Sequence, residues 1–152
     1  MFTQKTKGPR LLLVDDEERF RTTLAKRLKE KGFDVEDLGS GIEALEFLKE
    51  KKVDVIVLDI KMPGLDGIET LGEIKKSDPG IEVVLLTGHG TVDTAIEGMR
   101  NGAFDYLMKP CEIDNLILKI NGAFEVKKER DDRLKKAEER SRLDKLEKSV
   151  RF

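Results

Sequence analysis

The sequence predicts an α/β domain built on a doubly wound parallel β-sheet. Five short runs rich in aliphatic and β-branched residues recur through the first 107 of its 152 positions, and segments with helical spacing lie between them. Three of the runs are almost continuously apolar, which is typical of strands buried on both faces of a parallel sheet. The alternation of strands and helices with short connections indicates parallel strands with helices packed on both faces.

The apolar runs give the expected strands directly. Each run is four to six residues long, and residues that favour turns or helices separate it from the next. In chain order, the expected strands are Leu11–Val14, Val35–Leu38, Val53–Leu58, Val83–Leu86 and Phe104–Leu107.

Apolar residues repeat every three or four positions between these strands, which places them on one face of a helix. Gly32 and the pair Asn101-Gly102 are typical helix stops, Ser40 is a typical N-cap, and Pro110 precedes the last helix. The apolar positions of the five expected helices are Phe20, Leu24 and Leu28; Ile42, Leu45 and Leu48; Ile68, Leu71 and Ile74; Ile96 and Met99; and Ile113, Leu116, Ile117, Ile120 and Phe124.

The composition changes sharply from Glu125 onward. Nineteen of the 27 residues at positions 125–151 are charged, and neither Gly nor Pro interrupts them. Opposite charges four residues apart, such as Lys127 and Asp131, favour a helix that continues out of the fifth one. The apolar residues of this segment keep no steady heptad, so a solvated single helix and a coiled coil both stay open. They are Leu134, Leu143, Leu146 and Val150.

We expect a leader at residues 1–9, a folded domain at residues 10–124 and a charged helical extension or linker at residues 125–152. Residues 1–124 hold 18 Lys and Arg against 23 Asp and Glu, and residues 125–152 hold 11 against 8. Neither part has the basic excess of a nucleic-acid-binding protein, so direct nucleic-acid binding is not expected. No apolar run approaches a membrane span or a secretory signal. Together with a single cysteine, this predicts a cytoplasmic protein without an internal disulfide.

Chemically useful side chains follow four of the expected strands. In an open parallel sheet, ligands bind beyond the carboxyl ends of the strands, so side chains there are candidates for a shared site. One such residue alone is usually a helix cap or a surface residue, but their joint occurrence at four strand ends favours one site. The first strand is followed by Asp15, Asp16 and Glu17, the third by Asp59, the fourth by Thr87 and the fifth by Lys109.

These groups suit phosphoryl transfer to a carboxylate. The clustered carboxylates of Asp15, Asp16 and Asp59 would repel one another, and hard oxygen ligands of this kind favour Mg²⁺. Asp59 would act as the nucleophile and form an acyl phosphate. Mg²⁺ and Lys109 would neutralise the charge that develops on the transferred group, and Thr87 would donate a hydrogen bond to one of its oxygens.

Four segments closely resemble the signature segments of receiver domains in the response regulators of bacterial two-component systems. They are LLLVDDE, VIVLDIKMPGLDG, VVLLTGHG and DYLMKP, and the resemblance spans residues 10–124. It implies a flavodoxin-like fold, in which a five-stranded parallel sheet of order 2-1-3-4-5 packs against five helices, the last of them extended here. It also implies a phosphoprotein of phosphorelay signal transduction that promotes its own phosphorylation, and not a turnover enzyme.

The resemblance further implies roles for single residues. Asp59 resembles the phospho-acceptor, Asp16 the direct Mg²⁺ ligand, and Asp15 a second acidic residue that acts partly through water. The backbone carbonyl of Lys61 would complete the protein's share of the metal ligands. Lys109 resembles the lysine of this pocket, and its peptide bond to the following proline is expected to be cis.

Thr87 and Tyr106 resemble the pair of switch residues. By this resemblance, a sensor histidine kinase or a phosphotransfer protein donates a phosphoryl group to Asp59, Thr87 turns toward it, and Tyr106 moves into the vacated space. The surface formed by the fourth helix, the fifth strand and the fifth helix then changes its affinity for a partner. This surface and the extended helix also suggest a homodimer.

Other functions stay open beside that of a receiver working alone. TGHGTVDTAIEGMRNGAFDYLMKP resembles receivers of nitrogen-regulation-type enhancer-binding activators, which makes the chain a candidate N-terminal part of a larger transcriptional activator. This sequence itself carries no GxxxxGK[ST] phosphate loop and no helix-turn-helix. A second alternative is a docking module that is never phosphorylated. A phosphohydrolase of the haloacid-dehalogenase type is disfavoured, because that chemistry places an Asp where this chain has Lys61.

Overall fold

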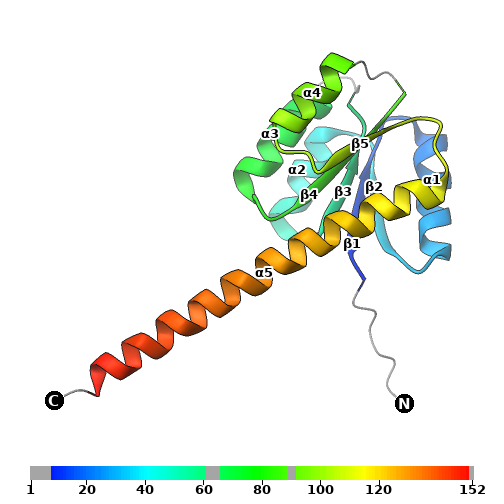
Figure 1. Ribbon diagram of the computed structural model, residues 1–152. Coiled ribbons are helices and arrows are strands. Elements are labelled where there is room, and N and C mark those ends of the chain that lie inside the picture. The colour runs from blue at the N-terminus through cyan, green and yellow to red at the C-terminus, as the bar shows by residue number, and fades with distance from the viewer. Residues whose placement is uncertain (1–7, 61–65, 89–91, 151–152) are drawn as a thin grey trace, which may run out of the picture.

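The computed structural model describes residues 8–60, 66–88 and 92–150. Within this part of the chain, five parallel strands form one sheet of order β2-β1-β3-β4-β5 with five helices, which confirms the predicted fold (Figure 1). In chain order, the elements are β1 (Arg10–Val14), α1 (Glu18–Glu30), β2 (Asp34–Leu38), α2 (Gly41–Glu50), β3 (Val55–Leu58), α3 (Gly67–Ser77), β4 (Glu82–Thr87), α4 (Val92–Arg100), β5 (Asp105–Met108) and α5 (Ile113–Ser149).

Helices cover both faces of the sheet because its central strands are apolar on both sides. Leu12 and Leu13 are neighbours in β1 and point to opposite faces, yet their exposed fractions are only 0% and 1%. Leu12 packs in the layer that contains α2 and α3, and Leu13 in the layer that contains α1 and α5. Complete burial of each such side chain contributes about 2 kcal/mol to folding.

Local signals in the sequence set the helix ends. Ser40 accepts a hydrogen bond from the main chain of the first turn of α2, as expected of an N-cap. Gly32 and Gly102 follow α1 and α4 with φ angles of +96° and +101°, a conformation that disfavours residues with a Cβ atom. Asp66 forms a capping box at the start of α3, which the sequence analysis did not identify.

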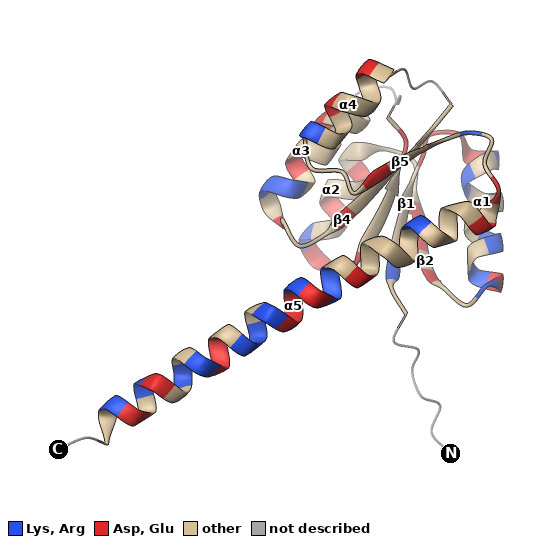
Figure 2. Ribbon diagram, viewed as in Figure 1, with Lys and Arg blue, Asp and Glu red and all other residues tan. Residues whose placement is uncertain are grey.

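The last helix is extended, as predicted, and leaves the body of the domain (Figure 1). Its 37 residues correspond to a length of about 55 Å. Its first turns bury Leu116, Ile120 and Ala123 against the sheet, whereas every residue from 131 to 150 is exposed. Acidic and basic residues alternate along this exposed part (Figure 2). Among the described helices, α5 included, none has the length and apolar character needed to cross a lipid bilayer.

Ion pairs fasten the middle of α5 to the amino ends of β3 and β4. Arg130 Nη2 lies 2.8 Å from an oxygen of Glu82, the first residue of β4, which is only 4% exposed. Lys127 Nζ lies 3.6 Å from Asp54, just before β3. A buried charge is costly without a partner, so these pairs hold α5 where it leaves the sheet. We call Asp54, Glu82, Lys127 and Arg130 the α5 anchor.

Candidate functional site

Four of the five strands end at one polar site. The Asp15 N–H donates to the last residue of β2, and the Asp59 N–H donates to the last residue of β1. Lys109 N donates to Thr87 O in the same way, at 2.8 Å. These bonds extend the sheet one residue past the strands and fix the backbone of the site. Asp15, Asp59 and Thr87 are accordingly buried, with 1%, 3% and 0% of their surface exposed.

A lysine ammonium whose side chain is only 12% exposed lies at the centre of this site. Lys109 Nζ lies 2.7 Å from Asp15 Oδ2 and 3.0 Å from Glu17 Oε1. It is 3.9 Å from Asp59 Oδ2 and 4.1 Å from the centre of the Phe20 ring. Burial acts to lower the pKa of Lys109, but the hydrogen bonds to Asp15 and Glu17 and the charge of Asp59 raise this pKa above its ordinary value. Lys109 therefore stays charged at ordinary pH.

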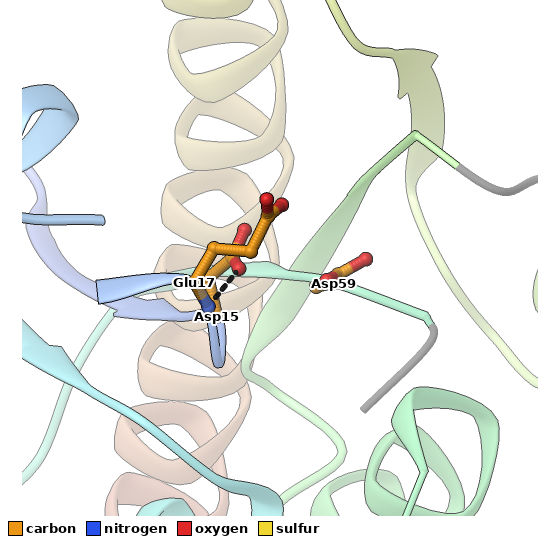
Figure 3. Close-up of side chains that lie close together, drawn as sticks. All are labelled: Asp15, Glu17 and Asp59. Carbon is orange, nitrogen blue, oxygen red and sulfur yellow. Dashed lines mark hydrogen bonds between the residues drawn. The ribbon is translucent and has the colours of Figure 1, made fainter. Parts of the chain in front are cut away.

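Three carboxylates gather around the ammonium. Asp15, Glu17 and Asp59 each offer one oxygen, and these oxygens lie within 4.8 Å of one another. Figure 3 shows their side chains at the ends of two neighbouring strands, β1 and β3. Asp15 and Asp59 are buried and Glu17 is exposed, and like charges this close need compensation by cations. A set made only of carboxylate oxygens fits a hard divalent cation. Asp16, the expected direct metal ligand, is exposed and is not one of the three.

Glu17 belongs to this site, although the sequence alone predicts no specific role for it. Its N–H donates to Asp15 Oδ1 at 2.9 Å (Figure 3), a local bond that turns the chain just after β1. Its carboxylate then reaches Lys109. The signal was present in the sequence as a third acidic residue in a row. A run of three acidic residues does not reveal which of them face the site, because that depends on the turn.

Thr87 and Tyr106 lie on the same face of the sheet. Thr87 pairs with Met108 across β4 and β5, and Tyr106 stands two residues before Met108 on the same strand. Thr87 is fully buried, whereas Tyr106 is 37% exposed. Tyr106 lines a surface hollow together with Ile96 and Met99 of α4. The two expected switch residues therefore share a face but differ in exposure.

Other expectations from the sequence concern the Lys109–Pro110 peptide bond, Lys61 and Cys111. The peptide bond between Lys109 and Pro110 is cis, as the resemblance implies. Lys61, whose carbonyl is expected to bind the metal, lies outside the described residues. Cys111 is a half-buried free cysteine, and burial raises the pKa of its thiol, which makes it a weak nucleophile.

The start of α3 packs directly against the backbone at Asp59. Gly67 N donates to Ile60 O at 2.7 Å. A Cβ atom at Gly67 would lie 2.5 Å from Ile60 Cα and closer still to Asp59 O. Only a hydrogen atom fits there. Gly67 therefore lets α3 support the main chain that presents the Asp59 carboxylate.

Known proteins resemble this chain over its folded part. The family model described as "Response regulator receiver domain" matches residues 11–121. The transcriptional regulatory protein ZraR of Klebsiella oxytoca is 42% identical over 113 residues, which cover 74% of this chain and 26% of that protein. A putative NtrX-like response regulator of Rickettsia conorii is 41% identical over 120 residues, which cover 78% and 25%. The chain thus spans about a quarter of the length of these relatives.

Solved structures give a similar comparison. A response regulator receiver domain protein from Clostridium thermocellum aligns with a TM-score of 0.75 and 40% identity, covering 78% of this chain and 96% of that one. NtrX from Brucella abortus aligns with a TM-score of 0.77 and 35% identity, covering 82% of this chain and 28% of that one. The likeness in sequence and the likeness in structure therefore cover similar shares of the chain.

Proposed function

This chain belongs to the family of response regulator receiver domains, and from this premise we propose that Asp59 accepts a phosphoryl group from a histidine kinase or a phosphotransfer protein. The observation that carries the proposal is the setting of Asp59, which is buried, 3.9 Å from the Lys109 ammonium and grouped with two other carboxylates. Charge that develops on a transferred phosphoryl group is strongly stabilised by cations already in position in a site with little water.

The proposed reaction is a single displacement. A carboxylate oxygen of Asp59 attacks the phosphorus of a phosphohistidine, so that an O–P bond forms while the N–P bond breaks and the imidazole leaves. Lys109 neutralises negative charge on the transferred oxygens. Mg²⁺ would supply the remaining positive charge, held by Asp15 and Asp59 of the carboxylate group and by Asp16 and the Lys61 carbonyl, two ligands that the family resemblance alone implies. The chain acts as the acceptor, so we do not propose sustained turnover.

Mass spectrometry of the intact protein tests this proposal. After incubation with Mg²⁺ and acetyl phosphate, the wild type is expected to gain one phosphoryl group. Asp59→Asn, which keeps the shape of the side chain but is a poor nucleophile, is expected to gain none, and a chelator should prevent the gain in the wild type. A wild type that stays unmodified at every donor and Mg²⁺ concentration would reject the proposal and favour an unphosphorylated docking module.

The same site supports a two-state switch. Thr87 is buried at the end of β4, the strand that pairs with β3, which Asp59 follows. We propose that its hydroxyl turns toward the phosphoryl group and that Tyr106, which is partly exposed, moves inward. The phosphoryl group then biases a bistable element through local charge.

Tyr106 can report on this switch by itself, because the chain holds one Tyr and no Trp. Beryllofluoride with Mg²⁺, which mimics a phosphoryl group on a carboxylate, is expected to lower the acrylamide quenching of tyrosine fluorescence as the ring leaves solvent. Asp59→Asn with the same reagents provides the baseline. An unchanged quenching constant in a wild type that binds beryllofluoride would contradict the proposed role of Tyr106.

The relatives suggest a wider setting for the receiver. They are about four times as long as the matched region, and one is a transcriptional regulatory protein. We propose that residues 10–124 form the receiver domain, that residues 125–152 form a linker toward an output, and that both act in the cytoplasm without direct nucleic-acid binding by this chain. The exposed Ile96 and Met99 of α4, β5 and the extended α5 would form a homodimer surface.

A further inference from the structure

The Lys109 ammonium is held from several sides before any phosphoryl group is present. An ammonium has three N–H groups, and among the described residues two of them donate to Asp15 and Glu17, at 2.7 and 3.0 Å. The ring of Phe20 covers another side, at 4.1 Å, a distance at which an aromatic face attracts a cation. Asp59, at 3.9 Å, is the farthest of the three carboxylates.

The two hydrogen bonds of the ammonium differ in exposure. The side chain of Asp15 is 2% exposed, whereas that of Glu17 is 62% exposed. Breaking a buried ion pair leaves a costly unpaired charge, but an exposed pair is weak because water can replace either partner. Asp15 is therefore a fixed partner of Lys109, and Glu17 is an exchangeable one.

We propose that Glu17 is a positioning residue that restrains Lys109 and slows the phosphorylation of Asp59, an inference that rests on the proposed function of Asp59. Lys109 moves toward a phosphoryl oxygen on Asp59 by loosening its bond to Glu17. The Glu17 carboxylate also lies within 4.8 Å of the Asp59 carboxylate, where its charge repels an anionic donor. Phe20 keeps the ammonium at the site when Glu17 releases it.

The test measures the rate constant for phosphorylation by acetyl phosphate in Mg²⁺, from intact mass against time. Glu17→Gln is expected to react about threefold to fivefold faster than the wild type, the factor that a single exposed ion pair supports. This gain should shrink at high salt, because salt screens exposed charges. Glu18→Gln, one position along in the first turn of α1, removes the same charge outside the acidic group and is expected to react like the wild type.

Glu17→Asp distinguishes the effect of the negative charge from the effect of the contact with Lys109. Its shorter side chain keeps the carboxylate but withdraws it from the ammonium, so it is expected to react faster than the wild type. A rate equal to that of the wild type would overturn the restraint on Lys109. If Glu17→Gln reacted no faster than Glu18→Gln, this would also overturn the restraint on Lys109. The proposed function would still stand in either case, provided that Asp59 is phosphorylated in the wild type. A wild type that takes no phosphoryl group would overturn both.

Discussion

Lys109→Met is expected to slow phosphorylation of Asp59 at least about a hundredfold, the effect of removing one preorganised charge-stabilising donor from an active site. Lys109 Nζ is the cationic group 3.9 Å from the Asp59 carboxylate, and it remains charged because its pKa is raised. Methionine keeps an unbranched side chain that can lie over Phe20, but it carries no charge. The rate constant with acetyl phosphate and Mg²⁺, followed by intact mass, measures the loss.

The same substitution is expected to lower the free energy of unfolding by about 3 kcal/mol in the presence of a chelator. It leaves the buried carboxylates of Asp15 and Asp59 without the ammonium, and Mg²⁺ should restore part of the loss by taking its place. Urea denaturation with and without Mg²⁺ separates the two contributions. Lys119→Met breaks a more exposed pair with Asp105 and should cost less than about 1 kcal/mol and leave phosphorylation unchanged. Equal effects of the two substitutions would contradict the assignment of Lys109.

Gly67→Ala is expected to cost about 2–4 kcal/mol of stability and to slow phosphorylation more than about tenfold. The added methyl group would stand 2.5 Å from Ile60 Cα and closer to Asp59 O, so either α3 or the backbone at Asp59 must shift. The shift that relieves contacts this short at Ile60 also moves the attached Asp59 relative to Lys109. Reactions that depend on orientation lose rate steeply when the nucleophile is displaced. Urea denaturation and the acetyl phosphate assay measure the two effects.

Gly72→Ala is the matched control, since it makes the same change in the same helix. A Cβ atom at Gly72 meets no neighbouring atom within 4 Å, and alanine favours a helix interior over glycine by about 1 kcal/mol. This variant is therefore expected to be slightly more stable than the wild type and equally active. If Gly67→Ala matched it in stability and rate, the packing of α3 against Asp59 would not control the site.

Much of the fold follows from the pattern of apolar residues. Runs such as Val55–Leu58 are buried along their whole length, and a short run of this kind is typical of a strand covered on both faces. The convergence of Asp15, Asp59, Thr87 and Lys109 was predictable for a related reason. Parallel strands end at the same edge of a sheet, so residues just after them meet even when 94 positions separate them, as for Asp15 and Lys109.

Other parts of the site depend on geometry that spacing does not encode. Sequence spacing predicts that Asp15 and Asp16 act together, but the turn closed by the Glu17 N–H directs Asp15 and Glu17 toward Lys109 and leaves Asp16 exposed. Phe20 was recognised only as an apolar position of a helix. Its contact with Lys109 depends on how α1 packs beside the β5–α5 connection, and this packing is a tertiary property.

The contacts of the α5 anchor also could not be predicted from local sequence patterns. The pair of Lys127 and Asp131, four residues apart, was predicted and is present. Arg130 and Glu82 are 48 positions apart, and no periodicity relates them. A buried Glu at the start of an apolar strand was the available signal, because a charged residue there requires a partner from elsewhere in the chain.

Because the α5 anchor holds the middle of α5 against the sheet, a small tilt of the helix there displaces its exposed far half. The 19 residues from Asp131 to Ser149 extend about 28 Å past it, so each degree of tilt at the anchor moves the far end by about 0.5 Å. Strand β4 begins at Glu82, which belongs to the α5 anchor, and ends at Thr87. This one strand therefore connects the α5 anchor to the proposed switch. A rotation too small to disturb the core would thus become an amplified displacement at the far end of α5.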